Sequence, residues 1–338
     1  MSGMAELGAS VIGLGMMGLR HGRVWAELPN TRLVAIYDIV PERAQEMAAE
    51  YGCLAAGSLE EAIEAPGVDM VSVCTDDQSH VEACTAAAEA GKHVLVEKPL
   101  ATSSADCNTI IAAAERNDTR LMVGHVVRFD PRYQVAKKMI DEGVVGDIVH
   151  IYGRRNNIVA SGRRIGPRTS VAYFLGVHDL DIMRWYSGCE AVRVYAESCR
   201  KVLVEEGADD TIFALLKYEN DAVGCLETCW IVPEGQPNTL DARLEVVGTE
   251  GRVAVRAGDS EPLEVSGPER SARPDVAYGP VIGGKQGGAL KYQLEHFATC
   301  LSEDDEFLIS PEDAKAAVVL ASAIHDALES GAPVSLSH

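Results

Sequence analysis

A lysine and a histidine eighty residues apart have the types and surroundings that proton chemistry needs. Lys98 stands in Glu97-Lys98-Pro99, directly after an apolar run, and His178 stands in Gly176-Val177-His178-Asp179-Leu180-Asp181. A lysine ammonium can hold a substrate oxygen and stabilise developing negative charge. A neutral imidazole accepts a proton near pH 7. If the second segment folds back onto the first, the pair would serve hydride transfer from an alcohol to a nicotinamide ring.

A glycine-rich turn near the start of the chain predicts the cofactor site. Gly13-Leu14-Gly15-Met16-Met17-Gly18 follows an apolar strand pattern and opens a helix pattern. The three glycines suit a tight turn, close approach to a pyrophosphate and close helix–strand packing, while the helix start, with Met16 and Met17, supplies amide donors. Asp38 ends the next strand pattern, where a carboxylate can accept from the adenosine ribose hydroxyls. These residues predict a bound dinucleotide.

Further residues are predicted to contact the same cofactor. Asp38 would repel a 2′-phosphate, so NAD is favoured, while Arg43 would tolerate the phosphate and keeps NADP as the alternative. Thr75 and Asp76 follow the fourth strand pattern, at the edge where such sheets bind ligands. His80 either lies near the cofactor or is a buried helix-packing histidine. Glu97 either orients Lys98 or contacts the nicotinamide ribose.

The elements that must position these residues change character along the chain. Strand patterns at 7–12, 32–37, 69–74, 93–96 and 120–125, with a weaker one at 53–56, alternate with helix patterns. Pro41 suits a helix start, Ser58 and Glu61 have capping-box spacing, and Gly91 marks a helix stop. This alternation predicts a parallel, doubly wound sheet over 1–125.

The second part, 126–310, is predicted to be an α+β domain with a mostly antiparallel sheet. After a helix at 132–143, strand patterns at 147–152, 191–199, 211–218, 222–230 and 244–247 follow each other with little helix between them. A helix at 170–186 interrupts them, and 258–289 is predicted to be loop. Helices at 290–301 and 311–329 end the chain, and the segment 311–330 is expected to pack back on the first domain.

Composition sets limits on location and partners. The 338 residues and a net charge of −21 favour a soluble two-domain protein and argue against nucleic acid, whose phosphates would be repelled. No apolar run is long enough for a membrane helix, and residues 1–10 lack a secretory signal, so we expect a cytoplasmic protein without a membrane partner. The nine cysteines form no C-x-x-C pair and are expected to be buried free thiols, with no metal bound.

Together these motifs resemble the glucose–fructose oxidoreductase / inositol dehydrogenase / MocA family. The resemblance rests on the glycine turn, on Asp77-Gln78-Ser79-His80, on the segment 90–99 and on the Gly-x-His-x-x-Asp motif at 176–181. It implies an NAD(P)-dependent dehydrogenase of a sugar, cyclitol or sugar nucleotide, with Lys98 and His178 as catalytic residues and a cis bond before Pro99. The segment 124–131 looks most like the branch of UDP-N-acetylglucosamine-type sugar dehydrogenases, which makes His125 a candidate substrate contact.

One position departs from this pattern. Many relatives carry an aspartate four residues before the histidine, where this chain has Phe174. Three explanations stay open: Lys98 and His178 suffice, Tyr173 or Asp181 substitutes, or the protein is not a standard alcohol dehydrogenase. Asp181 shares a helix face with His178, so it would orient the imidazole or touch a sugar hydroxyl.

Five arginines at 154, 155, 163, 164 and 168 stand out in this acidic chain. They are expected on the first strand of the second domain and the loop after it. Guanidinium groups suit carboxylate or phosphate recognition, so Arg154, Arg163 and Arg168 are candidate contacts to an anionic sugar. The alternative is ion pairing between subunits, because the resemblance implies a homodimer or homotetramer joined through the open face of the second sheet.

Two other functions remain alternatives at this stage. One is reduction of a C=C or C=N bond on the same fold, as in biliverdin-reductase-like relatives, which the missing aspartate motivates and the retained Lys98 and His178 disfavour. The other is a non-catalytic protein that senses NAD.

Overall fold

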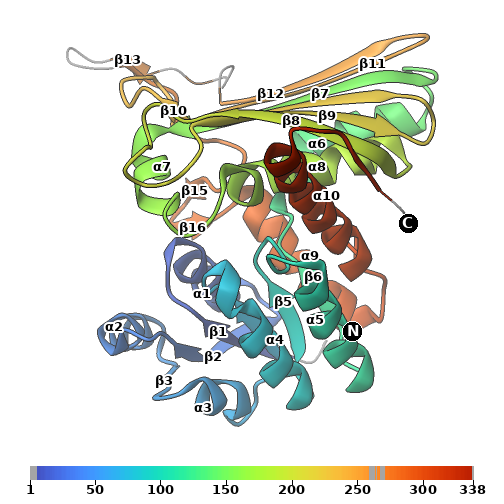
Figure 1. The fold of residues 1–338 in the computed structure, drawn as a ribbon. Coiled ribbons are helices and arrows are strands. Elements are labelled where there is room, and N and C mark those ends of the chain that lie inside the picture. The colour runs from blue at the N-terminus through green and yellow to red at the C-terminus, as the bar shows by residue number, and fades with distance from the viewer. Residues whose placement is uncertain (1–5, 259–262, 264, 267–270, 337–338) are drawn as a thin grey trace. The chain divides into compact units, whose positions relative to one another are not determined.

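The computed structural model describes residues 6–258, 263, 265–266 and 271–336. The chain divides into two units, each with its own sheet (Figure 1). The first unit comprises residues 1–126 and 278–315, and the second comprises 127–277 and 316–338. The predicted loop at 258–289 lies partly outside the described residues. In the described part it contains two short hairpins, Val265–Ser266 with Ser271–Ala272 (β13, β14) and Val281–Ile282 with Lys285–Gln286 (β15, β16).

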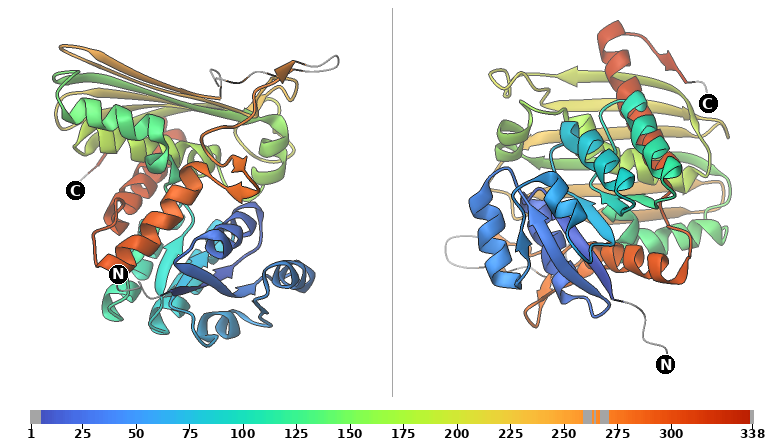
Figure 2. Two further views of the ribbon diagram at one scale, coloured as in Figure 1. Left: turned by 180° about the vertical axis from the view of Figure 1, so that it is seen from behind. Right: turned by 90° about the horizontal axis from the view of Figure 1, so that it is seen from below.

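The first unit is the predicted doubly wound sheet. Its six strands are parallel and run in the order β3-β2-β1-β4-β5-β6, with the switch in strand order between β1 and β4. Two further views of the ribbon show this part of the chain in blue to cyan (Figure 2). The strands coincide with the predicted ones to within two residues at either end. They are β1 Leu7–Ile12, β2 Thr31–Tyr37, β3 Leu54–Ala55, β4 Met70–Val73, β5 His93–Val96 and β6 Leu121–Val123.

The helices of this unit begin and end where local signals predict. Helix α2 has Pro41 at its first turn, and the Ser58 side chain accepts a hydrogen bond from the Glu61 N–H at the start of α3. The Glu61 carboxylate instead receives the N–H of Gly57, so the capping box is shifted by one residue. The helices are α1 Met16–Glu27, α2 Pro41–Tyr51, α3 Leu59–Glu64, α4 His80–Glu89, α5 Ser104–Arg116 and α9 Gly288–Glu303, with a 3-10 turn η1 at Asp77–Ser79.

The second unit contains a seven-stranded mixed sheet in the order β12-β11-β7-β10-β9-β8-β17. All neighbouring strands are antiparallel except β7 and β10, which confirms the mostly antiparallel prediction. The strands are β7 Ile148–Ile158, β8 Ala191–Cys199, β9 Thr211–Tyr218, β10 Val223–Val232, β11 Leu240–Gly248, β12 Arg252–Ala257 and β17 Val334–Ser335.

Helices cover one face of this sheet. Helices α6 Pro131–Asp141 and α8 Val177–Ser187 lie under it in Figure 1, and α7 Val159–Ile165 packs against β10. The segment after β7 was expected to be loop, and α7 corrects that expectation. Helix α10, Pro311–Ser330, begins in the first unit and continues in the second. Along β9, Ile212, Ala214 and Leu216 are buried on the helix side, whereas Phe213 and Leu215 are exposed.

No helix in the described part of the chain is both long and apolar enough to cross a membrane.

Candidate active site

The glycine turn joins β1 to α1, and each glycine has its own structural reason. Gly13 has φ +86°, and a Cβ there would lie 2.8 Å from the Cys74 carbonyl oxygen. A Cβ on Gly18 would lie 1.8 Å from the Gly13 carbonyl oxygen, so helix and turn could not approach each other. A Cβ on Gly15 would meet nothing within 4 Å. The space over Gly15, at the start of α1, therefore fits a pyrophosphate approaching the backbone.

Asp38 at the end of β2 also supports the turn. The Asp38 carboxylate is 7% exposed and accepts the N–H of Leu14 at 2.6 Å and the N–H of Val40 at 2.8 Å. Nη1 of Arg43 lies 3.8 Å from Oδ1 of the same carboxylate. Sequence reasoning assigned Asp38 to the ribose alone. The structure adds a second role, which the spacing of the motif could not show.

The end of β4 carries the next pair of predicted cofactor contacts. Asp76 is exposed and its carboxylate accepts a hydrogen bond from the Ser79 hydroxyl at 3.3 Å. The Thr75 hydroxyl donates to the Asp76 carbonyl at 3.3 Å. Both residues lie at the carboxyl edge of the parallel sheet, next to the switch in strand order, where ligands of such sheets bind.

The Glu97-Lys98-Pro99 turn follows β5 at the same edge, and the Lys98–Pro99 peptide bond is cis. Glu97 is buried, and its Oε1 accepts a hydrogen bond from Nε2 of His21 on α1 at 3.1 Å. Burial by itself would raise the pKa of Glu97, but this hydrogen bond and the charges of His21, Lys98 and His80 lower the pKa overall. Glu97 is thus held as a carboxylate beside Lys98.

Two more predicted residues lie near this turn. His80, at the start of α4, is buried and its Nδ1 donates to the Pro99 carbonyl at 2.9 Å. His125 follows β6 and is 1% exposed. A Cβ on the neighbouring Gly124 would lie 2.9 Å from Oε1 of Glu97, so the 124–125 segment passes close to that carboxylate. The first unit therefore brings His21, His80, Glu97 and Gly124 together around the lysine turn.

His178 lies in the second unit at the start of α8, and a π-helical turn, η3 Ala172–Gly176, precedes it. Such turns are rare and often occur at functional sites. The Tyr173 hydroxyl shares a hydrogen bond with Ser322 of α10 at 2.8 Å, and its ring stacks on His325. The Phe174 ring lies 6.3 Å from the Trp230 ring. Residues 173 and 174 are thus fixed to α10 and β10.

Asp179 and Asp181 both form buried ion pairs. Asp181 binds Arg128 through two hydrogen bonds, and Asp179 binds Arg155 in the same way, at 2.7 and 3.2 Å. All four side chains are less than 10% exposed. Sequence reasoning missed Arg128 and Arg155 as partners because both lie far from the helix in sequence.

The arginine-rich segment is distributed over two surfaces. Arg154 points to the sheet face opposite α8, where it pairs with Glu227 and Asp241. Arg163 lies on α7, is 62% exposed and sits 3.8 Å from Glu206. Arg168 is exposed just after that helix. Arg154 forms its ion pairs within the chain, and the two roles expected for these arginines, anion binding or ion pairing between subunits, stay predictions.

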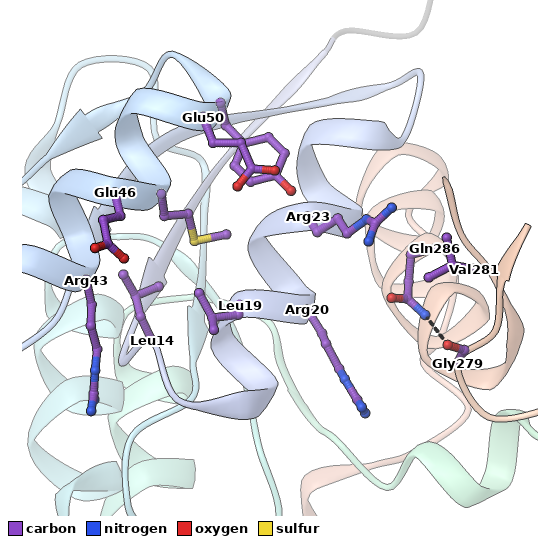
Figure 3. Close-up of a pocket in the computed structure, with 12 residues that line it drawn as sticks. Leu14, Leu19, Arg20, Arg23, Arg43, Glu46, Glu50, Gly279, Val281 and Gln286 are labelled. Carbon is purple, nitrogen blue, oxygen red and sulfur yellow. Dashed lines mark hydrogen bonds between the residues drawn. The ribbon is translucent and has the colours of Figure 1, made fainter. Parts of the chain in front are cut away.

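A groove of about 580 Å³ runs along the first unit beside the glycine turn (Figure 3). Leu14, Arg43 and Glu46 lie at one side of it, and Arg20 and Arg23 of α1 at the other. The β15–β16 hairpin closes its end, and Arg23 donates to the Gly284 carbonyl there. The groove lining includes Leu14 of the glycine turn and Arg43, which lies beside Asp38, but none of the residues of the lysine turn.

Fold and site together define a two-domain nucleotide-binding protein with a Rossmann domain. Residues 7–125 match the family GFO_IDH_MocA, described as "Oxidoreductase family, NAD-binding Rossmann fold", and residues 133–254 match the GFO/IDH/MocA C-terminal domain. The chain belongs to the GFO/IDH/MocA oxidoreductase family, as its motifs indicate, and is an NAD-dependent oxidoreductase of that family.

Several similar proteins are inositol dehydrogenases. The chain is 31% identical to inositol 2-dehydrogenase 1 of Saccharopolyspora erythraea over 96% of this chain and 95% of that protein. It is 26% identical to scyllo-inositol 2-dehydrogenase (NAD(+)) of Bacillus subtilis over 98% and 96%. A structure of scyllo-inositol dehydrogenase from Lactobacillus casei with bound NAD(H) and scyllo-inositol has the same fold, with a TM-score of 0.84 at 22% identity over 97% and 98% of the chains.

Proposed function

We propose that this protein is an NAD(P)-dependent dehydrogenase that interconverts a secondary hydroxyl and a ketone on a polyhydroxylated ring, with inositols as the first substrate class to test. The observation that carries the proposal is Lys98 on a buried, charge-supported turn at the carboxyl edge of the Rossmann sheet. The inositol 2-dehydrogenases among the relatives support the substrate class. The sugar-nucleotide branch stays a prediction.

In this proposal two side chains divide the proton chemistry. The nicotinamide cofactor supplies the hydride acceptor when it is bound. Lys98 donates a hydrogen bond to the reacting substrate oxygen and stabilises its negative charge. His178 in its neutral form takes the hydroxyl proton as the ketone forms, and returns it in the reverse direction. Gly13, Gly15 and Gly18 admit the pyrophosphate, and Asp38 and Thr75 lie where the adenosine half would bind.

The test is a substrate screen with both cofactors. Purified protein is titrated with NAD and NADP in a thermal-shift assay and then screened with myo-inositol, scyllo-inositol, neutral sugars, sugar acids and sugar nucleotides, following reduced-cofactor absorbance. Turnover of an inositol that Lys98→Met and His178→Asn abolish supports the proposal. Cofactor binding without turnover across the panel would instead favour the sensing protein. Oxidation of NADH or NADPH by C=C or C=N acceptors alone would favour the reductase, which the absent aspartate at Phe174 motivates.

Recognition of an anionic substrate is a separate proposal that concerns Arg163 and Arg168. Both residues are exposed, and Nε of Arg163 lies 3.8 Å from the Glu206 carboxylate. Arg163→Ala and Arg168→Ala should lower kcat/KM for sugar acids or sugar phosphates and leave neutral sugars unchanged. Equal losses on both classes, or no loss, would count against anion recognition.

We also propose a homodimer or homotetramer formed through the open sheet face of the second unit. Phe213, Leu215 and Val223 are 48%, 52% and 42% exposed on that face. Clustered apolar side chains of this size favour burial in an interface. Leu215→Glu should shift the mass measured by light scattering towards the monomer. Val135→Glu, at an exposed site on α6, is the matched control and should leave the mass unchanged.

A further inference from the structure

Two buried histidines hold the lysine turn from different elements of the Rossmann unit. His21 of α1 is 0% exposed and contacts the Glu97 carboxylate, one residue before Lys98. His80 of α4 is 1% exposed and contacts the Pro99 carbonyl, one residue after Lys98. No residue of the glycine turn takes part in either contact. The two hydrogen bonds therefore bracket the proposed catalytic lysine.

The hydrogen-bond partners determine which nitrogen of His21 carries the proton. The Trp25 indole N–H, which can only donate, donates to the Ser72 hydroxyl oxygen at 2.8 Å. That hydroxyl is therefore free to donate its own proton to Nδ1 of His21, 3.2 Å away. His21 then carries its proton on Nε2 and donates it to Glu97. In the chain Trp25–Ser72–His21–Glu97 each hydrogen bond then has one donor and one acceptor.

The same reasoning fixes His80. A carbonyl oxygen can only accept, so the contact with Pro99 requires the proton on Nδ1 of His80. His80 thus ties the backbone of the turn to the first residue of α4. His21 ties the side chain of Glu97 to the middle of α1. The two contacts restrain different atoms of the tripeptide, so neither can replace the other.

We propose that His21 and His80 are positioning residues that clamp Glu97 and Pro99 and thereby fix where Lys98 presents its ammonium group. The inference rests on the proposed catalytic role of Lys98. Electrostatics supports the proposed positioning role as well as geometry, because the Glu97 carboxylate interacts electrostatically with both Lys98 and His80. While His21 holds that carboxylate, the Glu97 side chain keeps one conformation, which fixes the position of its charge relative to Lys98.

Paired amide substitutions test the clamp at each histidine. The amide nitrogen of glutamine lies near the position of histidine Nε2, and that of asparagine lies near Nδ1. His21→Gln therefore keeps the donor to Glu97, whereas His21→Asn removes it. At position 80 the order is reversed: His80→Asn keeps the donor to Pro99, and His80→Gln removes it. The better amide differs between the two sites, so a general effect of side-chain size cannot produce the expected pattern.

The first readout needs no substrate. Reaction of Lys98 with an amine-reactive acylating reagent is followed from pH 7 to 10 by mass spectrometry of the Lys98 peptide in the full-length protein. In His21→Asn the released carboxylate can pair with Lys98 and keep it protonated. We expect Lys98 to be labelled about tenfold more slowly at pH 8 than in His21→Gln, a shift of about one pKa unit. His80→Gln and His80→Asn should differ from each other in the same assay.

The second readout is kinetic and uses whichever inositol proves to be a substrate. The two clamp-breaking variants should lose kcat while the Kd for NADH, measured by fluorescence, stays close to that of the wild type. The clamp-keeping variants should recover kcat. His296→Gln is the control, because His296 is a half-buried histidine of the same unit whose Nε2 accepts the Leu308 N–H away from the turn.

Two results would overturn the clamp. One is equal Lys98 labelling for Gln and Asn at each position. The other is a change of the same size in His296→Gln, which would point to general loosening of the domain. Failure of the proposed function looks different. In that case the wild type turns over nothing in the panel, while the labelling difference between the paired variants persists.

Discussion

Arg128 and Asp181 form a two-hydrogen-bond ion pair inside the second unit, with Nε to Oδ2 at 2.9 Å and Nη2 to Oδ1 at 2.6 Å. The side chains are 2% and 1% exposed, and the Arg128 guanidinium also lies over the Trp185 ring. Asp181 shares a helix with His178, three residues earlier. Its carboxylate is therefore committed to fastening α8 to the segment before α6.

This pairing predicts that Asp181 acts on stability. Asp181→Asn leaves the Arg128 charge buried without its counterion, so the free energy of unfolding should fall by about 3–5 kcal/mol. Urea unfolding followed by circular dichroism measures the loss. Replacing both partners, as in Arg128→Met with Asp181→Leu, should recover much of it. If Asp181→Asn unfolds like the wild type but loses turnover, Asp181 contacts substrate, as its place in the motif first suggested.

The double role of Asp38 makes a second prediction. Its carboxylate repels a 2′-phosphate, but it also holds the N–H groups of Leu14 and Val40. Asp38→Ala should therefore weaken binding of both NADH and NADPH, because the glycine turn loses its support. Asp38→Asn keeps one acceptor and removes the charge, so it should raise the NADPH preference by about tenfold, or 1.4 kcal/mol. Fluorescence titration with the two reduced cofactors gives the Kd values.

Arg43 supplies the control for this experiment. It lies at the same carboxylate and lines the groove in Figure 3, where a 2′-phosphate on the ribose would find a cation. Adding Arg43→Ala to Asp38→Asn should remove the gain for NADPH and leave NADH unchanged. A clear NADPH gain in Asp38→Ala with undiminished NADH affinity would show that the turn does not depend on Asp38.

The Rossmann half could be predicted closely because its signals are local. Glycine spacing, Pro41, Ser58 and the alternation of apolar runs each report on a few neighbouring residues, and the observed strands begin and end within two residues of the predicted ones. The second half carried weaker signals. Helix α7 follows β7 with no side-chain cap, which leaves its start without a sequence signature. Its Arg163 and Arg164 suggested an exposed loop.

The partners of the site residues could not be predicted, because they come from distant segments. Arg155 is 24 residues from Asp179, and His21 is 76 residues from Glu97. A single sequence contains no signal for such pairs. The π-helical turn before His178 is equally hidden in the sequence. A single turn with i→i+5 hydrogen bonds changes the spacing of apolar residues too little to differ from that of an ordinary helix. It nevertheless changes which residues face each other around Phe174.

The contacts of Tyr173 lead to a third prediction. Its hydroxyl is hydrogen-bonded to Ser322 and its ring stacks on His325, so it is held by α10. Tyr173→Phe should lower the free energy of unfolding by about 1 kcal/mol, as Ser322→Ala should, and leave the pH profile of kcat unchanged. Loss of one limb of that profile in Tyr173→Phe alone would instead identify Tyr173 as the substitute for the missing carboxylate.

A fourth prediction concerns Asp210, a buried residue directly before β9. Its carboxylate, 1% exposed, accepts the N–H groups of Lys201, Val202 and Leu203, at 2.5, 2.9 and 2.9 Å. Its backbone carbonyl accepts the N–H of Trp230, whose ring packs against Phe174. Burial raises the pKa of Asp210, but the three N–H groups outweigh it, so the pKa lies below the usual 3.8.

A carboxyl group whose pKa is lower in the folded state than in the unfolded state stabilises the fold above the unfolded pKa. This contribution is lost as the pH falls through the folded value. Asp210→Asn should therefore cost about 2 kcal/mol of unfolding free energy at pH 7, and the difference from the wild type should stay constant down to about pH 5 and shrink below about pH 4. Urea unfolding of both proteins at pH 7, 5, 4 and 3.5 measures that difference. A gap that is the same at every pH would mean that the carboxylate charge does not hold the 201–203 loop.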